Sequence, residues 1–258
     1  MDLRKKVFII ANVVAVLSTI IVNALANILP IGGNLTGDIS DNIPNLFVPA
    51  GLTFAIWGVI YVLILCFALY QLTDMFGKLE TKSDYIDKIS FWFILASIGN
   101  IVWIFLWHYE QIILSIIPML LLFVSLLMIY LRLGIGTSNV SKRERYFVHL
   151  PISIYLGWIT VATIANVTAV LVTLEVGGLI LGEILWTVLV ILVAMIITLL
   201  ILYQKRDIGY ALVIIWALLG ILIKQYDTYQ MIVITSGVSM VIIASYLAFQ
   251  LVRHKQVV

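Results

Sequence analysis

Polar and aromatic residues recur at helical spacing inside strongly apolar stretches of the sequence. At about 100° per residue, three sets each fall on one face of a helix. These sets are Asn12, Thr19, Asn23 and Asn27; Ala96, Gly99, Trp103 and Trp107, with Asn100 beside them; and Tyr155, Trp158, Ala162, Asn166 and Ala169. Together they predict a shared internal pocket with aromatic walls and amide hydrogen-bonding groups. Helix packing through small residues and interhelical amide bonds is the alternative interpretation.

The elements that carry these residues are predicted to be membrane-spanning helices. The chain of 258 residues is 63% hydrophobic and 11% charged, with a mean hydropathy of +1.16. A soluble domain is about one quarter charged, and a spanning helix needs about 20 apolar residues. The sequence therefore predicts an all-α, polytopic membrane bundle of about eight transmembrane helices: residues 7–29, 49–73, 89–107, 112–131, 147–172, 178–203, 208–224 and 229–252.

The basic residues predict the orientation of this bundle. If the N-terminus is cytoplasmic, Lys224 is the one basic residue outside, and fourteen of the 15 Lys and Arg residues lie inside. Cytoplasmic loops carry such an excess of positive charge. We therefore expect a multi-pass protein of the cell membrane with both termini in the cytoplasm. Lys224 and Asp227 are interpreted as an exposed pair at an outer helix end.

The first span has a second interpretation. Basic residues, an apolar stretch and then Ala24-Leu25-Ala26 are similar to a signal peptide with its cleavage site. The apolar run continues beyond that site, and Asn12 and Asn23 interrupt it. We therefore expect a retained helix.

The tryptophans divide into two groups by their distance from the predicted helix ends. Trp gathers at membrane interfaces, and the residues interpreted as such anchors are Trp92, Trp107 and Trp186. Trp103 and Trp158 lie further from the loops, and Trp57 lies two turns inside the second span, with Tyr61 one turn on. These residues are the stronger candidates for a pocket wall.

Glu183 is the acid expected inside a span, about two turns from the outer surface. A buried acid in a membrane helix can couple transport to protons, but an acid close enough to the outer face to stay hydrated is the interpretation that we favour. His108, His149 and His254 lie near predicted helix ends, where we expect hydrated imidazoles. No metal motif and no phosphate-binding loop is present in the sequence, and Cys66 is a lone cysteine.

The fifth predicted helix carries the most specific motif. Tyr155, Trp158, Ala162 and Asn166 have the spacing Tyr-x-x-Trp-x-x-x-Ala-x-x-x-Asn, which resembles the TspO/MBR family of tryptophan-rich sensory proteins. Two further segments are similar to the same family: Asn100 and Trp103 in the third helix, and residues 49–61, with Pro49, Phe54, Trp57 and Tyr61, at the start of the second.

The resemblance covers residues 7–172 and has local departures. Leu52 stands where the family has a tryptophan, the step from Phe54 to Trp57 is one residue short, and Ile104-Phe105 replaces Ser/Thr-Pro. These positions surround the family's ligand pocket, so a shared fold does not require the same ligand. The family has five helices, which makes this chain an enlarged relative: residues 1–172 would form the TspO-like domain, and 173–258 a three-helix addition.

The resemblance implies a membrane-buried pocket for a planar hydrophobic ligand, such as a porphyrin, haem or a sterol, often in a homodimer. The implied ligand-binding residues are Trp57, Tyr61, Asn100, Trp103, Tyr155, Trp158, Ala162 and Asn166. Residues 49–54 would close the pocket mouth. A tetrapyrrole could occupy the pocket, although no cofactor is required, and the expected partners are lipid and a small hydrophobic ligand rather than nucleic acid.

Two other functions remain open. A proton-coupled secondary transporter of a small molecule would use Glu183. An enzyme that degrades a bound macrocycle has been suggested within the family, but the sequence offers no independent nucleophile or cofactor loop, so an enzymatic role is not expected.

Overall fold

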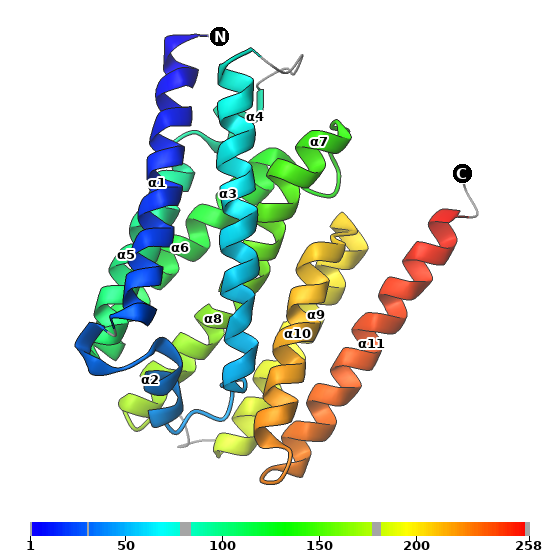
Figure 1. The fold of residues 1–258 in the computed structure, drawn as a ribbon. Coiled ribbons are helices and arrows are strands. Elements are labelled where there is room, and N and C mark those ends of the chain that lie inside the picture. The colour runs from blue at the N-terminus through cyan, green and yellow to red at the C-terminus, as the bar shows by residue number, and fades with distance from the viewer. Residues whose placement is uncertain (1, 30, 78–83, 177–181, 256–258) are drawn as a thin grey trace.

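The computed structural model describes residues 2–29, 31–77, 84–176 and 182–255 (Figure 1). Residues 253–255 are described by their backbone alone. The elements are α1 (Leu3–Ile28), η1 (Ile31–Gly33), α2 (Thr36–Asn42), η2 (Gly51–Ala55), α3 (Ile56–Met75), α4 (Asp84–Ile89), α5 (Trp92–His108), α6 (Ile112–Leu133), α7 (Lys142–Glu144), the π-helical turn η3 (Arg145–His149), α8 (Leu150–Thr173), α9 (Glu183–Lys205), α10 (Ile208–Gln225) and α11 (Gln230–Lys255). All are helical, in agreement with the predicted class.

Seven helical stretches in the described part of the chain are long and apolar enough to cross a membrane. They are Leu3–Ile28, Gly51–Met75, Ile112–Leu133, Lys142–Thr173, Glu183–Lys205, Ile208–Gln225 and Gln230–Val252. The predicted third span, residues 89–107, is not among these seven. Ser90 adopts a left-handed conformation (φ 51°) and separates α4 from α5. This leaves α5 with 17 residues, about 26 Å at 1.5 Å per residue against about 30 Å of hydrocarbon.

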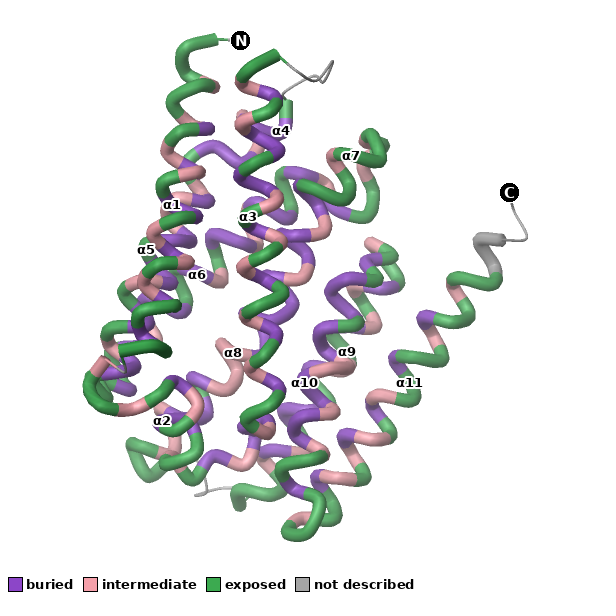
Figure 2. The backbone as a smooth tube through the Cα atoms, in the orientation of Figure 1, coloured by how far each residue is buried: buried purple, intermediate pink, exposed green. Residues whose placement is uncertain are grey.

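Helix α8 is the centre of the bundle. It packs against α3, α6 and α10, while α1 and α5 complete one side and α9 and α11 the other. Burial follows this arrangement, with α8 largely buried and the outer faces of α1 and α11 exposed (Figure 2). Both termini lie at one end of the bundle, and α2 and the α10–α11 turn lie at the opposite end (Figure 1).

The polar face of α1 is used for helix pairing. Asn12 Nδ2 donates to Gln71 Oε1 on α3 (2.9 Å), and Asn23 Nδ2 donates to Asn100 Oδ1 on α5 (2.6 Å). Asn27 is exposed and donates to the carbonyl of Asn23. Interhelical amide bonds stabilise membrane bundles by roughly 0.6 to 2 kcal/mol each. The polar face of α1 therefore packs into the bundle.

Helix α9 begins later than the predicted sixth span. The prediction placed its start at Gly178, which lies outside the described residues, whereas the described helix begins at Glu183. Glu183 is therefore in the first turn of α9 with an exposed side chain, not two turns inside a span.

Candidate functional site: an aromatic cavity

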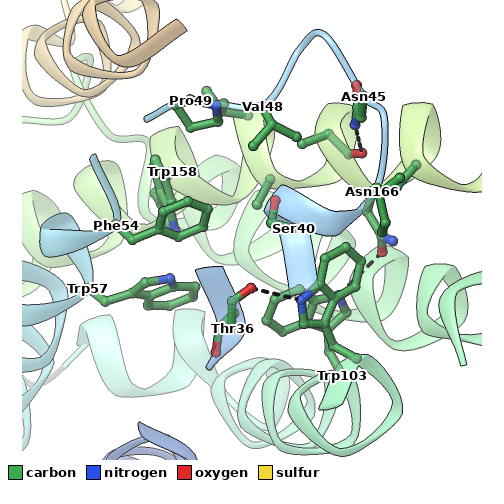
Figure 3. Close-up of a pocket in the computed structure, with 16 residues that line it drawn as sticks. Thr36, Ser40, Asn45, Val48, Pro49, Phe54, Trp57, Trp103, Trp158 and Asn166 are labelled. Atoms are coloured by element: carbon green, nitrogen blue, oxygen red, sulfur yellow. Dashed lines mark hydrogen bonds between the residues drawn. The ribbon is translucent and has the colours of Figure 1, made fainter. Parts of the chain in front are cut away.

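A small cavity lies between α3, α5, α8 and the segment of residues 36–55, which we call the cap (Figure 3). The cap contains α2 and η2 and folds over the ends of α5 and α8. The cavity has a volume of about 40 Å³. Its walls comprise Thr36, Ser40, Ile43, Asn45, Val48, Pro49, Phe54, Trp57, Trp103, Trp107, Trp158, Val161, Ala162, Ala165, Asn166 and Ala169.

Aromatic rings from four elements form most of one wall. The ring of Trp158 receives Phe54 edge-on at 5.9 Å between centroids and Trp57 edge-on at 6.2 Å. On α5, Trp103 and Trp107 are one turn apart and stack at 5.3 Å. Edge-on and offset-stacked arrangements are the favourable geometries for aromatic pairs. The rings therefore form a defined apolar box.

The fully buried side-chain polar atoms of the described cavity wall are, with one exception, already hydrogen-bonded. Trp103 Nε1 donates to Asn166 Oδ1 (3.3 Å), and Asn166 Nδ2 donates to Ser115 Oγ (2.8 Å). Trp107 Nε1 donates to the carbonyl of Thr36 (3.2 Å). The exception is Trp158, whose indole N–H has no acceptor among the described residues although the side chain is only 2% exposed. A buried donor without a partner costs about 1–3 kcal/mol.

The structure brings five of the eight predicted ligand-binding residues to the cavity wall: Trp57, Trp103, Trp158, Ala162 and Asn166. The other three lie behind it. Tyr61 stacks on Trp57 at 5.7 Å, and Asn100 donates to the hydroxyl of Tyr155 (3.1 Å). These three residues support the wall instead of lining it.

Several wall residues were not expected from the sequence. The interpretation of Trp107 as an interface anchor is wrong, because this residue is buried beneath the cap, on the face that its helical spacing from Trp103 had predicted. Thr36, Ser40 and Asn45 come from the cap, which has no helical periodicity to reveal its contacts. Asn45 reaches α8, where it donates to Thr168 Oγ1 (2.8 Å).

His108 corrects a second expectation. Its imidazole is 1% exposed, and it is held by Thr36 Oγ1 at Nε2 and by the carbonyl of Ile31 at Nδ1, both at 2.9 Å. His149 is likewise buried, and the side chain of His254 lies outside the described residues. The exposed setting expected for these rings is therefore wrong for His108 and His149, which are both buried.

Comparison with known proteins agrees with this geometry. Residues 9–249 match the model of a family described as TSPO-like protein. The chain belongs to the TSPO-like family. No curated protein and no solved structure matches it. The resemblance inferred from the motifs is thus confirmed, and with its apolar helices the chain is a multi-pass integral membrane protein. The family match extends through most of α11, so it is not confined to the first five predicted spans.

Helix α10 of this TSPO-like protein contributes to the cavity by holding the cap. The amide of Ala50 donates to the carbonyl of Gly220 (2.9 Å), and Trp216 Nε1 donates to the carbonyl of Thr53 (2.9 Å). Gly220 has no side chain at this contact, and a Cβ there would overlap Thr53 Oγ1.

The C-terminal end of α10 adds two more contacts to the cap. Gln225 Nε2 donates to the carbonyl of Leu46 (3.0 Å). Lys224 Nζ pairs with Asp41 Oδ1 at 2.6 Å, and not with Asp227 as the sequence suggested. Both partners of this pair are partly exposed, so the pair contributes little energy, but it fixes α10 against α2.

Proposed function

We propose that this TSPO-like protein binds a planar hydrophobic ligand in the aromatic cavity, in a sensory or transport role. In this proposal α5 is the eighth span, and both termini face the cytoplasm of a cell membrane. The ligand is porphyrin-like, haem-like or sterol-like, in keeping with the family. No cofactor is required for binding.

The unpartnered indole N–H of Trp158 carries the proposal. It is a buried donor in the wall of an apolar cavity, and a ligand oxygen, such as a carboxylate or carbonyl, would supply the missing acceptor. The rings of Trp57, Trp103 and Phe54 would then contact the ligand face. Small-molecule sites commonly combine such apolar walls with a few converging polar groups.

The size of the cavity adds a condition. Its volume of about 40 Å³ is far below the roughly 300–1,000 Å³ of typical ligand pockets. A macrocycle therefore enters only if the cap moves away from α5 and α8. We propose that binding and cap displacement are coupled, with the contacts to α10 setting how readily the cap moves.

The test is a titration of the purified protein in detergent with protoporphyrin IX, followed by the shift of the porphyrin absorption band. This readout does not depend on the number of tryptophans. We expect saturable binding that weakens about tenfold or more in Trp158→Phe, which removes a hydrogen bond to a charged or polar group. Trp158→Phe combined with Trp103→Phe should weaken it further.

Trp92→Phe is the matched control, because Trp92 lies on α5 but outside the cavity wall. It should bind as the unmodified protein does. A fluorescent sterol tested in parallel separates the two ligand classes. Absence of saturable binding of both, or equal effects of Trp158→Phe and Trp92→Phe, would overturn the proposal.

A further inference from the structure

A second and larger cavity lies at the other end of the bundle, the end that carries both termini (Figure 1). Its volume is about 370 Å³, within the range of small-molecule sites. Its lining is far more polar than that of the aromatic cavity: Ile135, Gly136, Ser138, Arg145, His149, Leu150, Ser153, Arg206, Asp207 and Ile208.

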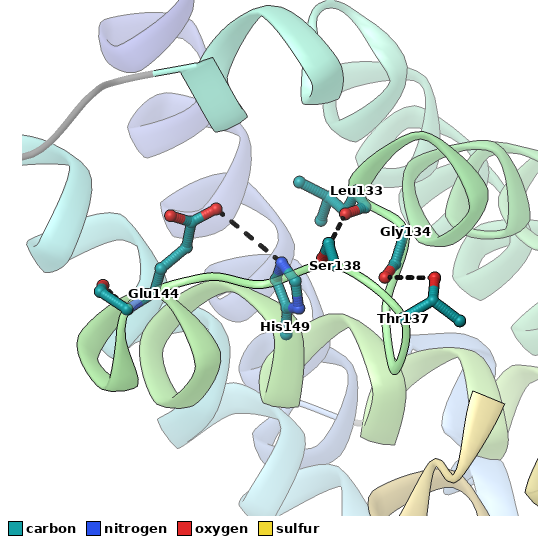
Figure 4. Close-up of polar contacts among 7 residues, drawn as sticks. Leu133, Gly134, Thr137, Ser138, Glu144 and His149 are labelled. Carbon is teal, nitrogen blue, oxygen red and sulfur yellow. Dashed lines mark hydrogen bonds and ion pairs between the residues drawn. The ribbon is translucent and has the colours of Figure 1, made fainter.

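Three connections meet to form this cavity: the loop after α6, the η3 turn, and the turn between α9 and α10. The loop approaches α9 so closely that a Cβ on Gly136, whose φ is 82°, would overlap the carbonyl oxygen of Lys205. The loop is folded on itself, since Ser138 Oγ donates to the carbonyl of Leu133 (3.0 Å) (Figure 4). The cavity wall is therefore built by specific contacts.

Asp207 places a partly satisfied carboxylate in this wall. The residue is 7% exposed. Its Oδ1 accepts from Ser153 Oγ (2.6 Å) and from the amide of Tyr210 (3.2 Å), which caps α10. Its Oδ2 has no partner among the described residues. The Tyr130 hydroxyl lies beside this carboxylate and is a donor of the chain itself, but no hydrogen bond of 3.5 Å or less joins the two groups. A buried carboxylate oxygen without a donor is costly, so this position favours a ligand that brings one.

His149 is the second buried group with unused capacity. It is 5% exposed, and its Nε2 lies 3.9 Å from Glu144 Oε1, beyond hydrogen-bond distance (Figure 4). The imidazole thus adds one more polar atom near the cavity that no described residue satisfies.

Two arginines supply the opposite charge. Arg145 and Arg206 line the cavity, and neither makes a salt bridge or side-chain hydrogen bond within the described part of the chain. A guanidinium stays charged at any physiological pH, and its planar donors fit phosphate and carboxylate oxygens. The lining therefore offers two positive charges and one negative charge to a ligand.

We propose that this cavity binds a phosphate monoester that carries a nearby amine. The phosphate, with a charge of about −1.5 to −2 at pH 7, balances Arg145 and Arg206. The ammonium donates to Oδ2 of Asp207 and balances its charge. A carboxylate, with one charge and two oxygens, would leave part of the arginine pair unmatched. A free phosphorylated amine carries this monoester, and an aminophospholipid headgroup carries the related pair of an ammonium and a singly charged phosphodiester.

The first experiment compares three probes on the purified full-length protein by calorimetry: O-phosphoethanolamine, inorganic phosphate and ethanolamine. We expect O-phosphoethanolamine to bind about tenfold or more tightly than phosphate, because it adds a charge-assisted hydrogen bond, and ethanolamine to bind weakest. This series needs no variant. If O-phosphoethanolamine shows no saturable binding, or no preference over phosphate, the proposal is wrong.

Variants then assign the contacts. Arg145→Gln with Arg206→Gln should weaken both phosphate-containing probes at least about tenfold, whereas Arg143→Gln, outside the cavity, should not. Asp207→Asn keeps the helix cap, since Asn also caps helices, and should abolish the preference for the amine while phosphate binding remains. A purely structural Asp207 would not change that preference, so an unchanged preference contradicts the assignment.

A last arm identifies the source of the ligand. The protein is placed in nanodiscs containing phosphatidylethanolamine and examined by native mass spectrometry. A retained lipid that O-phosphoethanolamine displaces indicates a headgroup site, and binding of the soluble probe with no retained lipid indicates a soluble ligand. A retained lipid that the soluble probe does not displace would place the lipid elsewhere and contradict the headgroup assignment.

Discussion

Replacing Gly220 with alanine tests whether α10 controls the cap. A Cβ at Gly220 would overlap Thr53 Oγ1 and lie 2.8 Å from the Cβ of Pro49. Both neighbours belong to the cap, so the overlap is relieved when the cap shifts away from α10. The shift breaks the bond between the amide of Ala50 and the carbonyl of Gly220. Overpacking of this kind costs about 1–3 kcal/mol, which corresponds to a population of open cap raised about 5- to 150-fold.

The assay measures access to the cavity through a cysteine. Ser40 lines the cavity and is 7% exposed, so Ser40→Cys, in a background with Cys66→Ser, is labelled by a maleimide only when the cap opens. If opening is fast relative to labelling, the labelling rate follows the open population. We expect Gly220→Ala to raise this rate by the factor given above.

Gly237→Ala is the matched control for the helix substitution itself. Gly237 lies on α11, and the nearest side-chain atom to its Cβ would be Leu222 Cδ1 at 3.6 Å, an ordinary contact. This variant should leave the labelling rate unchanged. Equal rates in the two glycine variants would refute the idea that α10 holds the cap closed.

Two further predictions follow from the structure. Gly99→Ala should lower the free energy of unfolding in detergent by about 1–3 kcal/mol, because its Cβ would lie 2.8 Å from the carbonyl oxygen of Pro118 on α6. Gly58→Ala is the control, because a Cβ at Gly58 has no atom within 4 Å, and it should not lower the stability. Equal thermal unfolding of the two variants would contradict the close packing of α5 on α6. Glu183→Gln should leave porphyrin binding unchanged, because Glu183 is exposed in the first turn of α9. For the same reason it should not change any uptake into proteoliposomes that a proton gradient drives. Loss of such uptake in this variant would instead support the transporter hypothesis.

The periodicity of the sequence was sufficient to predict the helical walls of the aromatic cavity. Trp158, Ala162 and Asn166 share one face of α8 because they are three or four residues apart, and the same rule groups Trp103 with Trp107 on α5. Hydropathy predicted most of the spans for a related reason. A backbone N–H or C=O group in lipid must find its hydrogen-bond partner within the same helix, so a long apolar segment in a membrane is helical. These predictions depend on local geometry alone.

The contributions of the cap could not be predicted in this way. Asn45 contacts Thr168, and Asp41 pairs with Lys224, across more than a hundred residues of sequence. Such contacts depend on how loops fold over helix ends, and no period in the sequence reports them. The preference of tryptophan for interfaces is likewise a statistical rule, and it misplaced Trp107 because it takes no account of a covering loop.

Helix α10 connects the two cavities physically. It runs without interruption over 18 residues, about 27 Å at 1.5 Å per residue. Asp207 caps its first turn beside the polar cavity, while Trp216 and Gly220 hold the cap of the aromatic cavity. A regular helix is stiff along its axis, so a tilt or rotation of α10 changes the geometry at both ends together. The two cavities, at opposite ends of the bundle, therefore share one wall-supporting helix.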